Sequence, residues 1–253
     1  MISKKKIRLI RSLRFAKFRN QNRKFIAEGP KVVDELLGST FSIDQIYATG
    51  EWLRMHNNPR LKPFLTEITE NELKAISNLT MPNQVLAVVE LPQKPLQIPV
   101  VSGFVLMLDG ISDPGNMGTI IRTADWFGIQ FIICSEYCVD LYNPKVIQAT
   151  AGSVFRIPVF YMPLEEYLAN TSADQNIFGA MLEGENIYTI ETGQQGIILI
   201  GNESHGISSK LLPFIKKKIR IPGYSKDRSF AAESLNASIA TAVICAEFMR
   251  RKE

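Results

Sequence analysis

The chain has 253 residues, of which 45% are hydrophobic and 21% are charged, and its formal net charge is +4. This balance excludes an intrinsically disordered chain, which combines low hydrophobicity with a high net charge. No apolar run approaches the ~18 residues that a membrane-spanning helix needs, and the basic N-terminus lacks the apolar segment of a secretory signal, so we expect no membrane anchor.

Residues that bind metals or form disulfides are few. The three cysteines, Cys134, Cys138 and Cys245, are too unevenly spaced for a disulfide framework or a zinc site. The two histidines, His56 and His205, lie far apart in the sequence, and neither belongs to a metal-binding motif. We therefore expect no metal ion, and a reducing, cytoplasmic location.

The net charge conceals an asymmetry along the chain. Residues 1–24 hold ten of the 29 lysines and arginines and no aspartate or glutamate. The remaining residues carry a net charge of −6. A basic cluster of this density predicts binding to a polyanion, either nucleic acid or an acidic membrane surface. The alternative is a solvated basic helix with no special role.

The segment LPQKPLQIP, residues 91–99, separates two parts of the chain. It carries three prolines, which disfavour both helix and sheet and favour an extended linker. We predict a small α/β domain at 1–91, a proline-rich linker at 92–99 and a second domain at 100–253.

The first of these domains favours alternating helices and strands. Thr69, with Glu72 three residues later, forms a capping box that predicts the start of a helix. In chain order we expect a helix at 3–20, a strand at 25–29, a helix at 30–37, a strand at 43–48, a helix from 69 to 76 and a strand at 84–91.

The second domain shows a more regular alternation. We expect strands at 104–108, 130–134, 157–160, 177–181, 196–200 and 219–222, and helices at 118–127, 144–152 and 235–250. This pattern predicts an α/β fold with a mostly parallel sheet that helices cover on both faces. Ligands of such sheets bind outside the carboxyl ends of the strands.

The loop at 108–129 follows the first of these strands. Asn116 can cap the helix after the loop, and Arg122 can point back from its second turn. The loop fits neither a P-loop nor a dinucleotide-binding fingerprint. The alternative is an ordinary turn with a cap and a surface arginine.

Two further loops carry polar residues and glycines. At 199–208, Gly201 permits close approach of a ligand to the backbone, and Glu203 could bind a ribose or an arginine. At 219–251, Ser234 and Asn236 are ordinary helix caps. An apolar stripe on the last helix predicts a core or subunit-interface face; its members are Leu235, Ile239, Ala242, Val243, Ala246 and Met249.

These three loops, in this order on an α/β scaffold, resemble the motifs of the SpoU (TrmH-like) family of RNA ribose 2′-O-methyltransferases. The first motif, D-P-x-N-x-G-x-x-x-R-T-A-x-x-F-G, is complete between Asp113 and Gly128. The second, G-N-E-x-x-G, is met at 201–206. The third, I-P followed by S-L-N, is met at 221–222 and 234–236.

The resemblance implies a fold and a cofactor. The second domain would contain a C-terminal trefoil knot, and the active unit would be a homodimer. The stretch 25–37 more loosely resembles the opening of the family's substrate-binding domain. The cofactor would be S-adenosylmethionine (SAM), with no metal required. The residues expected to hold it are Leu182, Gly184, Gly201, Asn202, Ile221, Pro222 and Leu235.

The resemblance also implies which side chains act on the RNA. Arg122 would clamp the target phosphate and stabilise the developing alkoxide, because a guanidinium stays protonated in proteins and is a poor general base. The alternative is that Arg122 acts as the base with help from a phosphate or Ser234. Asn116 would orient the ribose or Arg122, and Glu203 would fix one of the same two groups. Asn236 would complete the hydrogen bonds.

The substrate implied by the resemblance is ribosomal or transfer RNA, with ribosomal RNA favoured. The basic N-terminal segment would then bind RNA separately from the chemistry. The residues expected to do so are Lys4, Lys5, Lys6, Arg8, Arg11, Arg14, Arg19 and Arg23.

The chain departs from the family pattern at two places. Gly223 replaces a methionine of the third motif, and a longer segment than usual separates it from Ser234. Gln148 stands where the family often has an arginine. The first departure motivates an alternative, a non-catalytic RNA-binding module that retains the fold. A further alternative, a cofactor enzyme of small-molecule metabolism, is supported only by the α/β pattern.

Overall fold

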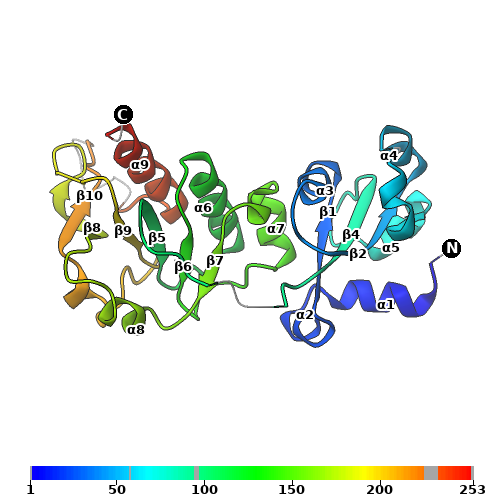
Figure 1. Cartoon of the computed structure of the whole chain (residues 1–253), viewed down its shortest axis with the longest axis horizontal. Coiled ribbons are helices and arrows are strands. Elements are labelled where there is room, and N and C mark those ends of the chain that lie inside the picture. The colour runs from blue at the N-terminus through cyan, green and yellow to red at the C-terminus, as the bar shows by residue number, and fades with distance from the viewer. Residues whose placement is uncertain (1, 57, 94–96, 225–232, 252–253) are drawn as a thin grey trace. The chain divides into compact units, whose positions relative to one another are not determined.

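The computed structural model describes residues 2–56, 58–93, 97–224 and 233–251 (Figure 1). The chain forms two compact units: unit 1 contains Met1–Pro95 and Asp140–Arg156, and unit 2 contains Leu96–Val139 and Ile157–Glu253. The expected domains 1–91 and 100–253 are continuous stretches, whereas unit 1 takes in a segment from the second of them. The domain limits therefore stay a prediction.

Unit 1 is built on a mixed sheet. Its strands are β1 (Lys24–Glu28), β2 (Ile43–Ala48), β3 (Leu65–Glu67) and β4 (Val85–Glu90), in the order β1-β4-β2-β3. Strand β4 lies antiparallel to β1 and β2, and β2 lies parallel to β3. The helices are α1 (Lys4–Ser12), α2 (Ala16–Asn22), α3 (Pro30–Leu37), α4 (Gly50–Met55), α5 (Glu70–Ile76) and α7 (Pro144–Thr150), with 3-10 helices at Pro59–Phe64 and Ser153–Phe155.

Local sequence signals account for several elements of unit 1. Helix α3 and strand β2 have the predicted bounds. The capping box is confirmed, because the Thr69 hydroxyl accepts a hydrogen bond from the Glu72 amide while the Glu72 carboxylate accepts one from the Thr69 amide. Helix α4 and strand β3 were not among the predicted elements; both are short.

The helix predicted at 3–20 is wrong as a single element, because α1 ends at Ser12 and α2 begins at Ala16. The guanidinium of Arg19 donates to the carbonyl oxygens of Leu13 (3.0 Å) and Arg14 (2.9 Å). Those oxygens would accept backbone amides in a continuous helix. Leu13 is fully buried at the break. A tertiary contact therefore overrides the helical periodicity of this segment.

Unit 2 contains the larger sheet. Its strands are β5 (Phe104–Leu108), β6 (Ile132–Cys134), β7 (Val159–Tyr161), β8 (Ile177–Asn186), β9 (Gly196–Ile200) and β10 (Lys217–Arg220). They are ordered β10-β8-β9-β5-β6-β7, and each neighbouring pair is parallel, which confirms the predicted sheet. The helices are α6 (Pro114–Trp126), α8 (Leu164–Ala169) and α9 (Ala237–Arg250), with a 3-10 helix at Leu212–Phe214.

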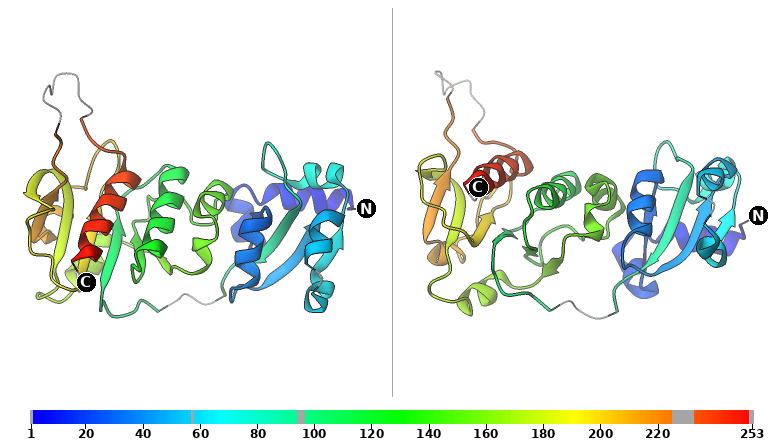
Figure 2. Two further views of the ribbon diagram at one scale, coloured as in Figure 1. Left: turned by 90° about the horizontal axis from the view of Figure 1, so that it is seen from above. Right: turned by 45° about the horizontal axis from the view of Figure 1, so that its top comes forward.

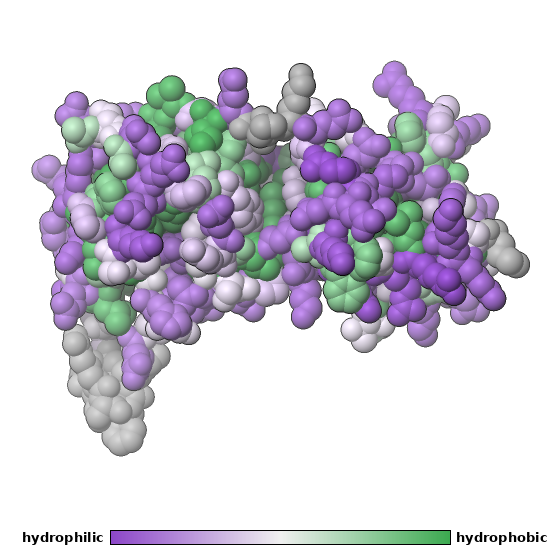
Figure 3. Space-filling model, turned by 90° about the horizontal axis from the view of Figure 1, so that it is seen from below, coloured by the Kyte–Doolittle hydropathy of each residue, from purple (hydrophilic) through white to green (hydrophobic). Residues whose placement is uncertain are grey.

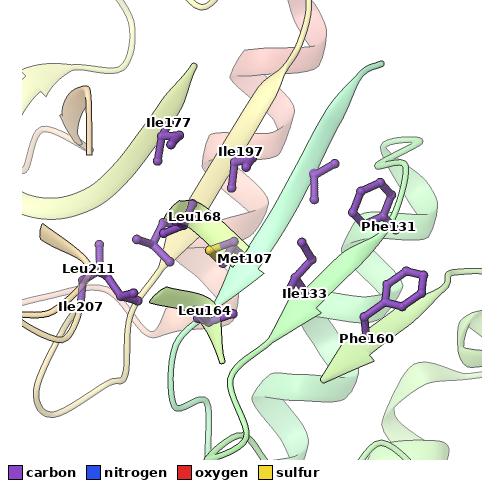
Figure 4. Close-up of a cluster of buried hydrophobic side chains, with 12 residues drawn as sticks. Met107, Phe131, Ile133, Phe160, Leu164, Leu168, Ile177, Ile197, Ile207 and Leu211 are labelled. Carbon is purple, nitrogen blue, oxygen red and sulfur yellow. The ribbon is translucent and has the colours of Figure 1, made fainter. Parts of the chain in front are cut away.

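Helices cover both faces of this sheet. On one face, Met107 of β5 lies in a buried cluster with Leu164 and Leu168 of α8 (Figure 4). On the other, the ring of Phe248 on α9 packs edge-on against Phe104 (5.2 Å between ring centres) and Phe178 (5.0 Å). Helices α6 and α9 lie side by side on this second face (Figure 2). Among the described residues, no helix is both long enough and apolar enough to cross a bilayer.

The apolar stripe of α9 does not face the core of unit 2. Ile239 is 51% exposed and Leu235, just before the helix, is 49% exposed. The buried residues of the helix are instead Ala237, Ser238, Thr241, Ile244, Cys245, Glu247 and Phe248. Of the two predicted roles of the stripe, the core is therefore wrong for this unit, and the subunit interface stays a prediction.

Candidate functional site

The three motif loops of unit 2 follow strands β5, β9 and β10. Because all six strands are parallel, their carboxyl ends lie along one edge of the sheet. Strands β5 and β9 are direct neighbours, with Leu108 paired to Ile200 at their ends. The first and second loops therefore leave the sheet side by side.

The first loop opens helix α6 earlier than predicted. The helix begins at Pro114 rather than residue 118, and Asp113 caps it by accepting a hydrogen bond from the Asn116 amide (2.8 Å). The predicted cap at Asn116 is therefore wrong. Proline is favoured in the first turn because its missing amide would be unpaired there in any case. The side chain of Asn116 is left available for other contacts.

A hydrogen-bonded network joins the three loops. The Asn116 side-chain amide donates to Glu203 Oε1 (2.6 Å), and the Asn236 amide donates to Asn116 Oδ1 (2.9 Å). Asn236 also caps α9, because its Oδ1 accepts from the backbone amide of Ser238 (2.9 Å). Three residues singled out from the sequence thus meet, although up to 120 positions separate them.

This network brings the amino-terminal ends of α6 and α9 together. Each helix end has backbone amides without intrahelical partners and a partial positive charge. Two such ends at one place favour an anion, such as a phosphate or a developing alkoxide. The Glu203 carboxylate lies at the same place, where it accepts from the side-chain amide of Asn116.

A second set of contacts fixes the first two loops to each other. The Asn202 side-chain amide donates to the Gly110 carbonyl oxygen (2.7 Å), while its oxygen accepts from the backbone amide of Ser204 (2.8 Å). The Asp109 carboxylate accepts from the backbone amide of Ser208 (2.8 Å). Asp109 was not singled out from the sequence; its position directly after a buried strand was the available signal.

Residues that follow strand β6 hold the start of the first loop in place. Ser135 Oγ accepts the Gly110 amide (2.9 Å), and the Cys138 thiol donates to the Leu108 carbonyl (3.3 Å). A hydrogen bond with Cys134 lowers the pKa of Cys138 to about 7, while burial raises the pKa of Cys134 well above its ordinary value. Cys138 is buried, so we assign it a structural role.

Two glycines allow a close backbone approach at this edge. A Cβ on Gly201 would lie 2.2 Å from the carbonyl carbon of Gly206, where the loop folds back on itself. Gly184 has φ +158°, and a Cβ there would lie 2.6 Å from the carbonyl carbon of Lys218. No larger residue fits either position without moving the backbone.

The other expected cofactor residues are partly open to solvent. Leu182 on β8 is 71% exposed, and Ile221 and Pro222, just after β10, are half-buried. Strands β8, β9 and β10 are adjacent in the sheet. The described part of the chain thus presents apolar side chains and glycine backbone at neighbouring strand ends.

Two expected catalytic residues lie outside the network. Arg122 on α6 and Ser234 before α9 are exposed, and neither forms a hydrogen bond or ion pair with any described residue. The expectation that Asn116 or Glu203 fixes Arg122 is therefore not met in a single chain. Glu203 is bonded to Asn116 instead. Across the described residues, no group of three or more candidate ligands is placed to hold a metal ion.

The basic residues of unit 1 differ in their accessibility. Lys4, Lys5, Lys6, Arg8, Arg11, Arg14 and Arg23 are exposed, and Figure 3 shows hydrophilic residues over unit 1. Arg19 is only 2% exposed, because its guanidinium donates to Asp140 Oδ2 (2.6 Å) as well as to backbone carbonyls. Arg19 is therefore not available to RNA, which corrects its expected role.

Comparison with known proteins finds two family models. The SpoU rRNA Methylase family matches residues 103–246, and the MRM3-like substrate binding domain matches residues 4–87. A curated relative from Bacillus subtilis, "23S rRNA (guanosine(2553)-2′-O)-methyltransferase RlmP", is 28% identical and aligned over 94% of each chain.

Solved structures resemble the whole chain. A putative RNA methyltransferase of the TrmH family from Porphyromonas gingivalis is 36% identical, with a TM-score of 0.88 and 99% of both chains covered. An AdoMet-bound rRNA methyltransferase from Sinorhizobium meliloti is 28% identical, with a TM-score of 0.86, and covers 99% of this chain and 96% of that one.

Proposed function

The chain belongs to the SpoU rRNA Methylase family, and we propose that it transfers the methyl group of SAM to a ribose 2′-hydroxyl of ribosomal RNA. The observation that carries this proposal is the Asn116–Glu203–Asn236 network, which joins the three motif loops at one edge of the sheet. A non-catalytic RNA-binding module finds no support, because the relative RlmP and the S. meliloti protein are described as methyltransferases.

The strand ends of β8, β9 and β10 fit SAM. Exposed Leu182 and Leu235 offer apolar surface for an adenine, and the tight loop at Gly201 brings backbone donors and acceptors close to it. When bound, SAM supplies an electrophilic methyl group. The chain's own contribution is to hold the cofactor and the ribose in line for displacement. We assign Leu182, Gly184, Gly201, Asn202, Ile221, Pro222 and Leu235 to this binding.

The acceptor ribose would lie near the amino-terminal ends of α6 and α9. Those ends stabilise negative charge on the 2′-oxygen, and Asn116 is positioned by two hydrogen bonds to orient the ribose. Arg122 lies six residues after Asn116 on α6 and is free to bind the target phosphate. Ser234 is free to contact the same group. No metal ion is required for this chemistry.

We also propose that two copies form a homodimer through unit 2. Helices α6 and α9 expose apolar residues that unit 2 does not bury: Trp126 is 83% exposed and Ile239 is 51% exposed. A partner on this face would cover them and would lie beside Arg122. The family resemblance further implies a trefoil knot in unit 2. Three free cysteines fit a reducing, cytoplasmic location.

A methyl-transfer assay tests the proposal. Wild-type chain, labelled SAM and ribosomal RNA lacking the modification should give label on ribose 2′-oxygens. Arg122→Ala should lower kcat by roughly 10²- to 10³-fold, the usual cost of losing one transition-state charge partner, and leave SAM affinity unchanged. Arg54→Ala, which removes an exposed arginine of α4, is the matched control.

Two results would count against the proposal in different ways. Full activity of the Arg122→Ala variant would refute the role of Arg122 alone. No transfer by the wild-type chain to ribosomal RNA, despite SAM binding in calorimetry, would refute the proposed function.

A further inference from the structure

The turn between α1 and α2 presents an aromatic ring on a basic surface. Phe15 is 51% exposed, although Leu13, two residues before it, is fully buried. The Arg14 guanidinium carbon lies 4.6 Å from the centre of the Phe15 ring. Phe18 meets the same ring in a T-shaped arrangement at 6.4 Å. The Arg14 guanidinium therefore lies over one face of the ring and Phe18 meets the ring at an angle, while the residue as a whole stays 51% exposed.

Hydrogen bonds from a buried arginine hold this turn in one geometry. Buried Arg19 donates to the carbonyl oxygens of Leu13 and Arg14, and its other nitrogen is paired with Asp140. The Phe15 carbonyl oxygen accepts the backbone amides of Phe18 and Arg19, both at 3.1 Å. Single exposed apolar residues are common and need no function. Here, in addition, the buried Arg19 fixes the backbone on both sides of the residue that carries the exposed ring.

The surroundings of the ring specify the chemistry of a partner. Residues 1–24 contain no acidic side chain. Five cations of α1 are exposed: Lys4, Lys5, Lys6, Arg8 and Arg11. Cations beside an exposed aromatic ring are the arrangement with which proteins bind single-stranded nucleic acid, because the cations follow the phosphates and a base stacks on the ring.

We propose that Phe15 is a stacking platform for an unpaired base of the substrate RNA, with Arg14 binding the adjacent phosphate. The proposal rests on the proposed function, since it takes RNA as the substrate. It adds that unit 1 recognises an unpaired nucleotide rather than a continuous duplex, because a base can stack on a side chain only after leaving its helix. Arg19 acts as a positioning residue.

Equilibrium binding of the full chain to a short oligoadenylate and to an RNA duplex of equal length tests this without SAM. Phe15→Ala should weaken oligoadenylate binding roughly 5- to 150-fold, the range measured for loss of one base–aromatic stack, and change duplex binding little. Phe15→Trp should restore it. The salt dependence should not change, since Phe15 releases no counterions. Phe64→Ala, which removes another exposed aromatic ring of unit 1, is the matched control.

Three outcomes would overturn the platform: equal losses in the Phe15→Ala and Phe64→Ala variants, equal losses on oligoadenylate and duplex, or no loss at all. Binding of the wild-type chain to anionic vesicles that Phe15→Ala abolishes, with oligoadenylate binding intact, would also overturn it in favour of a membrane surface. Because the assay measures affinity alone, an absence of methyl transfer refutes the proposed function and leaves this result standing.

Discussion

The two units place their candidate functional residues in opposite ways. In unit 1 the five cations of α1 are exposed. In unit 2 Asn116, Glu203 and Asn236 come from three loops and are tied together by hydrogen bonds. Binding a flexible polyanion needs charge density, whereas methyl transfer needs atoms held within a fraction of an ångström. The difference teaches that rigidity is concentrated where chemistry is expected.

The largest expected effect comes from adding a side chain to the second loop of unit 2, where there is no room for one. Gly201→Ala puts a Cβ against the Gly206 backbone, which must move. We expect SAM affinity to be lost in calorimetry and thermal stability of unit 2 to fall by about 2–3 kcal/mol. Gly223→Ala is the matched control, because an added Cβ there meets no atom within 4 Å. If both variants bind SAM like the wild type, the loop at Gly201 is not part of the cofactor site.

In unit 1 the buried Arg19 holds the turn between α1 and α2, and its removal is the next largest effect. Arg19→Ala leaves two carbonyl oxygens and the Asp140 carboxylate without their donor. We expect a loss of about 2–4 kcal/mol in urea unfolding. Arg11→Ala, which removes an exposed cation from α1, should change stability by less than about 0.5 kcal/mol. Equal losses would show that the cations of unit 1 are not divided into a structural and a binding class.

Removing exposed charges alone should weaken RNA binding and leave the free energy of unfolding unchanged. Replacing Lys4, Lys5 and Lys6 together with glutamine should make the slope of log affinity against log salt less steep. The expected change is about 2, at roughly 0.7 per phosphate contact on a single strand. Unfolding should be unchanged. The control is Lys210→Gln, at an exposed position of unit 2. An unchanged slope would remove α1 from the RNA-binding surface.

The smallest expected effect concerns the stability of unit 2 against unfolding at acidic pH. Hydrogen bonds from Arg250 and Arg251 lower the pKa of Glu247 to about 2 from an ordinary 4.5. Because the folded pKa is the lower one, this stabilisation is present above pH 4.5 and is lost as pH falls towards 2. In thermal unfolding, Glu247→Gln should be less stable than wild type at neutral pH, and the difference should shrink over that window. A constant difference would contradict the shift.

Local signals predicted much of the fold. The capping box at Thr69 and the proline at the start of α3 depend on residues within one turn, and both elements formed where predicted. The alternation of apolar strands and helices was sufficient for the parallel sheet of unit 2. The break between α1 and α2 was not predictable in this way, because Arg19 reaches Asp140, 121 positions away.

The candidate site shows the same limit. Spacing and residue type singled out Asn116, Glu203 and Asn236, and the structure brings them together. The sequence could not show that Arg122 stays apart from them, since that depends on how α6 is rotated against α9. It also misassigned the face of α9, because a charged residue, Glu247, lies on the buried side and is neutralised by two arginines.

The position of Asn236 has a consequence for biosynthesis. Its side chain both caps α9 and completes the hydrogen bonds of Asn116, and it follows Asn116 by 120 residues. While the ribosome makes the chain, the first and second loops can form before α9 exists, but Asn116 must wait for its last partner. The network of the three motif loops is therefore completed only after all six strands of unit 2 have been synthesised. A nascent chain would complete α1, with its exposed cations, long before it completed this network.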